Sequence, residues 1–272
     1  MGSYNYERCR TCGLLTLDPF PTLEIIENHY SEKFDAGNYQ TLLSFSDRYR
    51  QIYIDYVKWI GRHVRLPGKR TLDIGCFTGE LVAALMTEGA DARGVELQER
   101  AVRIAEKRLP GRVFAVNIDE ADGPFADASL DVITLMAVIE HVQDPVKLVR
   151  RIRTLLKEGG WLFLETPNAS SWPAQLTRRF WPLLAPVEHL HLFSERAIRH
   201  ALEDEGFDVV ELRPHVKWLP AAYVYDMLQY YGPEWRAVAG PLFRVLPESV
   251  RQRTLFPFFA GEMLVAARAR LR

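Results

Sequence analysis

The feature that most constrains the fold of this chain is a regular alternation of strand-like and helix-like runs that begins at Arg70. Helical patterns cover residues 80–87, 98–108 and 145–156, and short apolar runs lie between them. Such alternation is typical of a mostly parallel sheet with helices on both faces. We therefore predict an α/β fold. The predicted strands are residues 71–74, 92–95, 112–116, 130–135, 161–165, 207–212 and 262–267.

The rest of the chain divides at turn signals. The Leu66-Pro67-Gly68 turn separates two leading parts from residues 67–272, which carry the alternation. Residues 1–21 are predicted to be a small appendage and residues 22–66 a helical segment. Two stretches rich in aromatic residues and proline, 168–188 and 214–261, interrupt the alternation, and we expect ordered lid insertions there.

Charge and composition narrow the classes of partner. The 34 basic and 35 acidic residues give a formal net charge of -1, which argues against a nucleic-acid partner. No stretch reaches the roughly 20 apolar residues that a membrane-spanning helix needs, and no apolar run near residue 1 predicts a signal peptide. With only three cysteines, we expect a cytoplasmic protein. We also expect a monomer or homodimer that acts on a small molecule.

A glycine-containing loop follows the first predicted strand of the sheet. Gly75 and Gly79 lie at a strand-to-helix turn, where the missing β-carbons let a ligand approach the backbone. A dinucleotide enzyme would carry G-x-G-x-x-G, whereas the spacing here is G-x-x-x-G with Asp73 two residues earlier. A carboxylate at that place repels a pyrophosphate and suits a cationic amino-acid ligand.

Two further polar positions follow the next two strands. Glu96 comes 17 positions after Gly79, where an acid can accept both hydroxyls of a ribose. Asn117, Ile118 and Asp119 follow the third strand and offer an amide and backbone groups to an adenine edge. These positions fall at successive strand ends, where open α/β sheets bind ligands.

Taken in order, these motifs resemble the class I S-adenosylmethionine-dependent methyltransferases. The resemblance implies a Rossmann-like seven-stranded sheet with the last strand antiparallel, S-adenosyl-L-methionine as cofactor and methyl transfer to O, N or C of a sugar, aromatic or lipid-linked metabolite. Phe77 departs from it, because the family usually has a third glycine there. The match rests on residues 72–79, 94–96, 129–141, 156–168 and 206–207. The cofactor-binding residues that the resemblance implies are Asp73, Gly75, Cys76, Phe77, Gly79, Glu96, Leu97, Asn117, Ile118, Met136 and Ala137.

Three histidines are candidates for catalytic roles. His141 follows Glu140 just beyond the fourth strand, and a histidine there can act as a general base or can hold the loop by hydrogen bonds. His189 and His191 precede a helix that Ser194 is expected to cap, and each is a base or a structural residue. No metal is expected, because Ala137 stands where some ubiquinone-pathway O-methyltransferases carry an additional acid before the Glu-His pair.

The pair Cys9 and Cys12 resembles half of a zinc knuckle. A subgroup of these methyltransferases carries a small zinc-binding module before the cofactor domain, and this chain would then hold a truncated version of it. A four-cysteine site needs a second pair, and the remaining cysteine, Cys76, lies in the glycine loop. We therefore expect two thiols without metal.

Two other functions remain open beside methyl transfer. One is a cofactor-binding module without catalysis that acts through partners, which the motifs alone do not exclude. The other is a nicotinamide-dependent dehydrogenase, which Asp73 and the glycine spacing disfavour.

Overall fold

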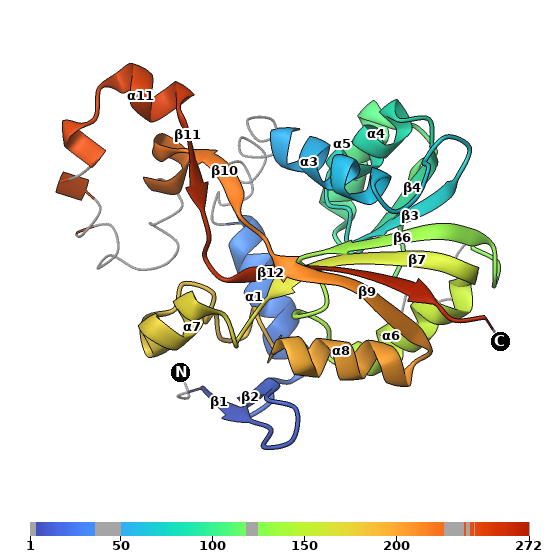
Figure 1. Ribbon diagram of the computed structural model, residues 1–272, viewed down its shortest axis with the longest axis horizontal. Coiled ribbons are helices and arrows are strands. Elements are labelled where there is room, and N and C mark those ends of the chain that lie inside the picture. The colour runs from blue at the N-terminus through green and yellow to red at the C-terminus, as the bar shows by residue number, and fades with distance from the viewer. Residues whose placement is uncertain are drawn as a thin grey trace.

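The computed structural model describes residues 4–35, 50–117, 125–225, 237, 240–241 and 243–271. Its centre is a seven-stranded sheet (Figure 1) with strand order β5-β4-β3-β6-β7-β12-β9. All seven predicted strands are present. They are β3 (Arg70–Ile74), β4 (Asp91–Glu96), β5 (Val113–Ala115), β6 (Leu130–Met136), β7 (Leu156–Pro167), β9 (Phe207–Pro214) and β12 (Glu262–Ala269).

The direction of the strands follows the prediction. Strands β5, β4, β3, β6 and β7 pair in parallel, and the last strand, β12, is antiparallel to both of its neighbours, β7 and β9. In this register Asp73 lies opposite Gly94 of β4 and Thr134 of β6, while Glu165 lies opposite Met136 of β6 and Leu264 of β12. The carboxyl ends of the parallel strands therefore meet at one edge of the sheet.

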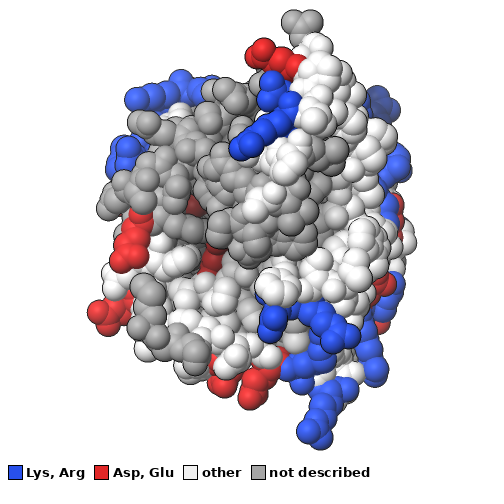
Figure 2. Space-filling model, turned by 90° about the vertical axis from the view of Figure 1, so that its left-hand side faces the viewer, with Lys and Arg blue, Asp and Glu red and all other residues white. Residues whose placement is uncertain are grey.

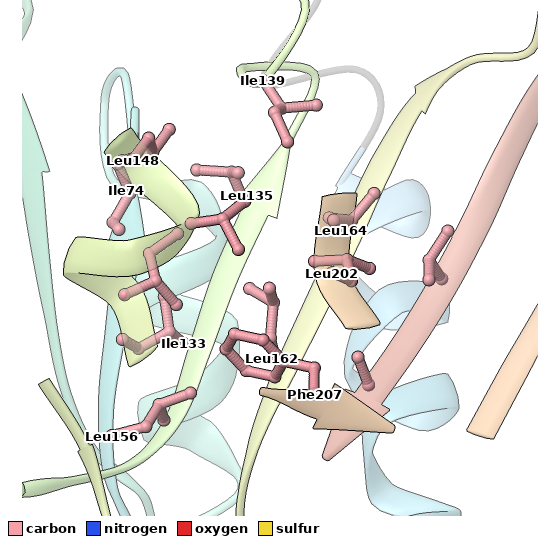
Figure 3. Close-up of a cluster of buried hydrophobic side chains, with 14 of the residues drawn as sticks. Ile74, Ile133, Leu135, Ile139, Leu148, Leu156, Leu162, Leu164, Leu202 and Phe207 are labelled. Carbon is pink, nitrogen blue, oxygen red and sulfur yellow. The ribbon is translucent and has the colours of Figure 1, made fainter. Parts of the chain in front are cut away.

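Helices cover both faces of the sheet and enclose two apolar cores. One face packs against α3 (Arg50–Gly61), α4 (Glu80–Thr87) and α5 (Glu99–Arg108), and the other against α6 (Pro145–Leu155) and α8 (Glu195–Asp204). Figure 3 shows the second core, to which α6 contributes Leu148, α8 contributes Leu202, and β7 contributes Leu162 and Leu164. Alternate residues of β7 face opposite cores, because successive side chains of a strand point to opposite faces.

Capping residues define the starts of both helices on this second face. Asp144 accepts a hydrogen bond from the backbone of Lys147 at the start of α6. Ser194, the cap predicted for α8, accepts one from the backbone of Ala197. Its hydroxyl also donates to the carbonyl of Cys12 at 2.6 Å, which ties the N-terminal turn to α8.

The N-terminal segment forms a small second sheet. Strands β1 (Asn5–Arg8) and β2 (Leu15–Asp18) make a hairpin, and β8 (His191–Leu192) pairs with β2. Helix α1 (Leu23–Asp35) follows the hairpin. The small sheet thus attaches the first residues of the chain to the segment between β7 and α8. Of the described helices, none has the length and apolarity to cross a membrane.

The two interrupting stretches contain regular structure. Residues 168–188 hold α7 (Trp172–Thr177) and the short η1 (Arg178–Phe180), with their own apolar cluster around Trp181. The described part of 214–261 holds β10 (Lys217–Pro220), which pairs with β11 (Leu255–Phe258), and α11 (Glu248–Arg253). Tyr230, Tyr231 and Trp235 lie outside the described residues. Figure 2 views the side that carries α7 and α11 and shows Lys, Arg, Asp and Glu side chains along its rim.

Candidate active site

The loop between β3 and α4 has a conformation that requires glycine at two positions. Gly75 and Gly79 have φ angles of +71° and +79°, in the left-handed region. A β-carbon at Gly75 would lie 2.5 Å from Val138 Cγ2, and one at Gly79 would lie 2.7 Å from Leu109 Cδ1. The loop therefore turns tightly at the carboxyl end of β3 and presents its backbone there.

Two non-glycine residues of the site, Phe77 and Ala137, also have φ angles in the left-handed region. Phe77 has a φ of +48°, so the position where the sequence departs from the expected glycine still adopts the conformation that glycine favours. Ala137, which follows β6, has a φ of +54°. Such strain persists where surrounding contacts hold it. The backbone N–H of Phe77 donates to Glu96 Oε2 at 2.9 Å, and that of Ala137 donates to the Glu165 carbonyl at 3.0 Å.

Asp73 is a buried carboxyl group at the end of β3. Its Oδ1 accepts a hydrogen bond from Thr134 at 2.6 Å. Burial, with a smaller contribution from the charge of Glu96, raises the pKa of Asp73 to about 7. A cationic group bound beside this carboxyl would favour its ionised form, so the site fits the positively charged amino-acid end of S-adenosylmethionine.

Glu96 ends β4 and connects the glycine loop to the start of α5. Its two oxygens accept backbone hydrogen bonds of 2.9 Å, one from Phe77 and one from Gln98. Each carboxylate oxygen has two lone pairs, so each can accept a further hydrogen bond from a ribose hydroxyl. The side chain is half-buried, which keeps it within reach of a ligand.

The other predicted cofactor residues occupy different kinds of position. Cys76 is buried with its sulfur against Gly94, where a β-carbon would come within 2.4 Å, so it contributes its backbone to the loop. Leu97 is 62% exposed beside Glu96. Asn117 is half-buried just after β5, Met136 ends β6, and Ile118 lies outside the described residues.

His141 and His189 form a pair beside Glu140. Their ring centroids lie 4.9 Å apart. Nδ1 of His141 donates to the Glu188 carbonyl at 2.6 Å, and Nδ1 of His189 donates to the Leu183 carbonyl at 2.7 Å. Ligand atoms of Glu140, His141 and His189 all lie within 4.8 Å of one another, so this group has the geometry to hold a metal ion. His189 thus supplies a third ligand that the sequence interpretation had not considered.

His191 lies in a different environment from His189. It is part of β8, it is 7% exposed, and burial lowers its pKa. Its Nε2 donates to the Gln143 carbonyl at 3.3 Å, and its Nδ1 lies 3.4 Å from the hydroxyl of Thr16. His191 therefore connects the N-terminal sheet to the loop that follows β6.

Cys9 and Cys12 lie in the turn of the β1–β2 hairpin. Cys9 is exposed, and the backbone N–H groups of Cys12 and Thr11 lower the pKa of its thiol to about 7. The thiolate is the form that binds metals, so the turn offers two possible ligands. Both thiols are free in the structure.

A buried polar cluster on the α3 face was not found from the sequence. Glu165 of β7 accepts hydrogen bonds from Tyr56 of α3 and, at 2.8 Å, from both His215 Nδ1 and Lys217 Nζ. Lys217 also lies 2.8 Å from Glu262 Oε1. The one signal in the sequence was the acidic residue Glu165 at the end of the apolar run 162–164.

Comparisons with known proteins identify relatives of this chain. A family model described as a methyltransferase domain matches residues 47–212. The chain is 41% identical over 116 residues to a protein of Paraburkholderia phymatum named ubiquinone biosynthesis O-methyltransferase, with 41% of this chain and 50% of that one covered. The chain thus spans about half the length of the curated relatives it matches.

Solved structures share the fold at low sequence identity. A methyltransferase structure from Thermotoga maritima, described as a possible histamine N-methyltransferase, has a TM-score of 0.58 and 18% identity, and the match covers 89% of this chain and 99% of that one. One from Bacillus halodurans has a TM-score of 0.58 and 16% identity, with 80% and 99% covered. The sheet order and the loop after β3 define the class I methyltransferase fold. The chain belongs to the methyltransferase domain family.

Proposed function

We propose that this protein transfers a methyl group from S-adenosyl-L-methionine to a small-molecule acceptor and releases S-adenosyl-L-homocysteine. The observation that carries the proposal is the position of Glu96. One carboxylate oxygen accepts a hydrogen bond from the glycine loop, and the other accepts one from the start of α5. Glu96 lies at the carboxyl edge of the parallel strands, where open α/β sheets bind ligands.

The proposed roles follow the edge of the sheet. Asp73, Gly75 and Gly79 hold the methionine end, with the backbones of Cys76 and Phe77 beside it, and Glu96 with Leu97 holds the ribose. Asn117 and Ile118 frame the adenine, and Met136 and Ala137 flank the sulfur. When bound, the cofactor supplies an electrophilic methyl group on a sulfonium. The task of the chain is then to align the acceptor and to remove its proton where necessary.

We assign positioning roles to the three histidines. His141 and His189 bond carbonyls of residues 183–188, which fixes that segment beside the loop following β6. His191 joins the same loop to the N-terminal sheet. Under this assignment no metal takes part. Zinc binding to the wild-type protein that is lost in His189→Ala would contradict it.

The name of the Paraburkholderia phymatum relative supports an oxygen atom as the methylated group. The free thiols of Cys9, Cys12 and Cys76 support a cytoplasmic location, where thiols stay reduced.

The direct test is calorimetry with two ligands. S-adenosylhomocysteine is expected to bind and NADH is not, because Asp73 opposes a pyrophosphate. Transfer of labelled methyl from S-adenosylmethionine to a panel of hydroxylated and amino compounds then separates an enzyme from a non-catalytic module. Binding of NADH alone would identify a dehydrogenase, and cofactor binding without transfer to any compound would identify a binding module.

A further inference from the structure

The polar cluster around Glu165 lies beside the proposed cofactor site, on the same face of the sheet. Glu165 is opposite Met136, and adjacent strands lie about 4.8 Å apart. Burial raises the pKa of Tyr53 on α3, and the charges of Glu80, Asp73 and Glu165 add to this effect, so Tyr53 lies in the electrostatic field of both regions. Glu165 is therefore one strand away from Met136, which is proposed to flank the sulfur.

The ionisation state of the cluster follows from its contacts. Burial alone would raise the pKa of Glu165, but the Lys217 ammonium and His215 outweigh it and hold the pKa well below its usual range. Burial would lower the pKa of Lys217, but the carboxylates of Glu165 and Glu262 hold it well above its usual range. Glu165 is thus an anion that only accepts hydrogen bonds.

An acceptor-only carboxylate fixes the orientation of His215. Its Nδ1 must carry the proton that is donated to Glu165 Oε1 at 2.8 Å, so in the neutral ring Nε2 carries the lone pair. The ring is 7% exposed and packs against Tyr56 with centroids 5.3 Å apart. A carboxylate that orients a histidine in this way also stabilises the imidazolium formed when Nε2 takes a proton.

His215 lines a cavity of about 250 Å³ between α3 and β10. A cavity of about 150 Å³ holds benzene, so this one has room for a substituted ring. Its other walls combine apolar and aromatic side chains with three charged ones. They are Ile52, Tyr56, Val216, Trp218 and Leu264, together with Asp55, Arg213 and Lys217.

We propose that His215, oriented by Glu165, is the catalytic base that takes the proton from the hydroxyl of a hydroxylated aromatic acceptor bound in this cavity. The inference rests on the proposed methyl transfer. As the O–H bond breaks, its electron pair forms the new O–CH₃ bond. The C–S bond of the sulfonium breaks with its pair left on sulfur, and the proton stays on His215 Nε2 until water removes it.

Glu262 holds the ammonium group of Lys217 in the cluster. Its Oε1 pairs with Lys217, whereas its Oε2 is buried and has no hydrogen-bond partner among the described residues. Glu262 does not line the cavity, so it acts on a molecule bound there only through Lys217.

The test uses the full chain loaded with S-adenosylhomocysteine, with catechol and phenol as probes. Side-chain ¹⁵N NMR of the wild-type protein should show His215 with its proton on Nδ1, and catechol and phenol should each shift the Nε2 resonance. A resonance that catechol leaves unmoved, or a neutral ring protonated on Nε2, overturns the proposal.

Variants then measure the chemical role. His215→Gln should lower kcat for catechol methylation by about 100-fold or more, as for loss of a general base, with S-adenosylhomocysteine affinity within twofold of wild type. His200→Gln, on the exposed surface of α8, is the matched control and should keep full kcat. Unchanged kcat in a folded His215→Gln overturns the assignment. Failure of the wild-type protein to bind S-adenosylhomocysteine would instead refute the proposed function itself.

Discussion

Thr134 donates a hydrogen bond of 2.6 Å to Asp73, and the two residues lie opposite each other on β6 and β3. Both side chains are buried at the edge where the cofactor is proposed to bind. The hydroxyl compensates only part of the cost of burying a carboxylate, because the pKa of Asp73 is still raised to about 7. The ionised form of Asp73 is therefore unfavourable in the free protein, and a cationic ligand bound beside it would make that form favourable.

The first prediction concerns stability and pH without ligand. The native state keeps the Asp73 proton up to about pH 7, whereas the unfolded chain releases it near the ordinary aspartate pKa of 3.8. Since the native state binds more protons in this window, the free energy of unfolding should fall as pH rises through it, by up to about 4 kcal/mol. Asp73→Asn should remove this slope and be more stable than wild type at pH 8.

Urea unfolding at pH 5 and pH 8 measures that difference. Asp73→Asn should also lose most of its affinity for S-adenosylhomocysteine, which calorimetry detects. Parallel stability curves for the variant and the wild-type protein across this range would contradict the assignment of the slope to Asp73.

The second prediction concerns the ribose contact. Glu96→Ala should weaken S-adenosylhomocysteine binding about 10- to 100-fold, because two hydroxyls lose a charged acceptor and the loop loses its bond at Phe77. Glu99→Ala is the control, since Glu99 forms an exposed ion pair with Arg103 on α5. Equal affinities of both variants in calorimetry would refute the cofactor site.

The third prediction concerns the strained backbone at Phe77. Phe77→Gly and Phe77→Ala both remove the ring, but only glycine adopts a φ near +48° without a steric cost. Phe77→Gly should therefore be more stable than Phe77→Ala by about 1 kcal/mol in urea unfolding. An alanine variant as stable as the glycine variant would show that the loop relaxes.

The fourth prediction separates the histidines by their contacts. His191→Gln should lower the free energy of unfolding by about 1 to 2 kcal/mol, because a buried side chain loses its bond to Gln143. His141→Ala should instead increase hydrogen exchange in residues 183–189, because the Glu188 carbonyl loses its donor. A loss of 100-fold or more in kcat with unchanged exchange would return His141 to a catalytic role.

The fifth prediction concerns the proposed acceptor cavity. Trp218→Ala should raise the KM for catechol and leave S-adenosylhomocysteine affinity nearly unchanged, because Trp218 lines the cavity between α3 and β10. Trp172→Ala is the control, since Trp172 is 65% exposed on α7. A KM that changes equally in both variants would remove Trp218 from the acceptor site.

Most of the sheet could be predicted because its signals are local. Apolar runs and turn residues located all seven strands, and the glycines at 75 and 79 marked the loop that needs a left-handed backbone. The cap at Ser194 was likewise a local pattern. Each of these features depends on residues a few positions apart, so periodicity and residue type suffice.

The Glu165 cluster depends on contacts that no local pattern encodes. Glu165 and His215 are 50 residues apart and Glu165 and Tyr56 are 109 apart, and the antiparallel entry of β12 between β7 and β9 brings Glu262 beside Lys217. The pairing of His141 with His189 is equally non-local. Sequence reasoning identified both histidines as candidates, but it could not tell that they share one environment.

The position of β12 also imposes an order of assembly. Strand β9 lies at the edge of the sheet, and its partner is β12, the last of the described strands. During synthesis β9 is therefore made before its hydrogen-bonding neighbour β12. Glu165 of β7 likewise lacks its β12 partner, Leu264, until then. The pairing of β3 with β4 and β6 uses residues up to 136 only, whereas the sheet beside Glu165 is complete only once residues 262–269 have been synthesised. The strands of the proposed cofactor site thus precede the strand that completes the proposed acceptor site.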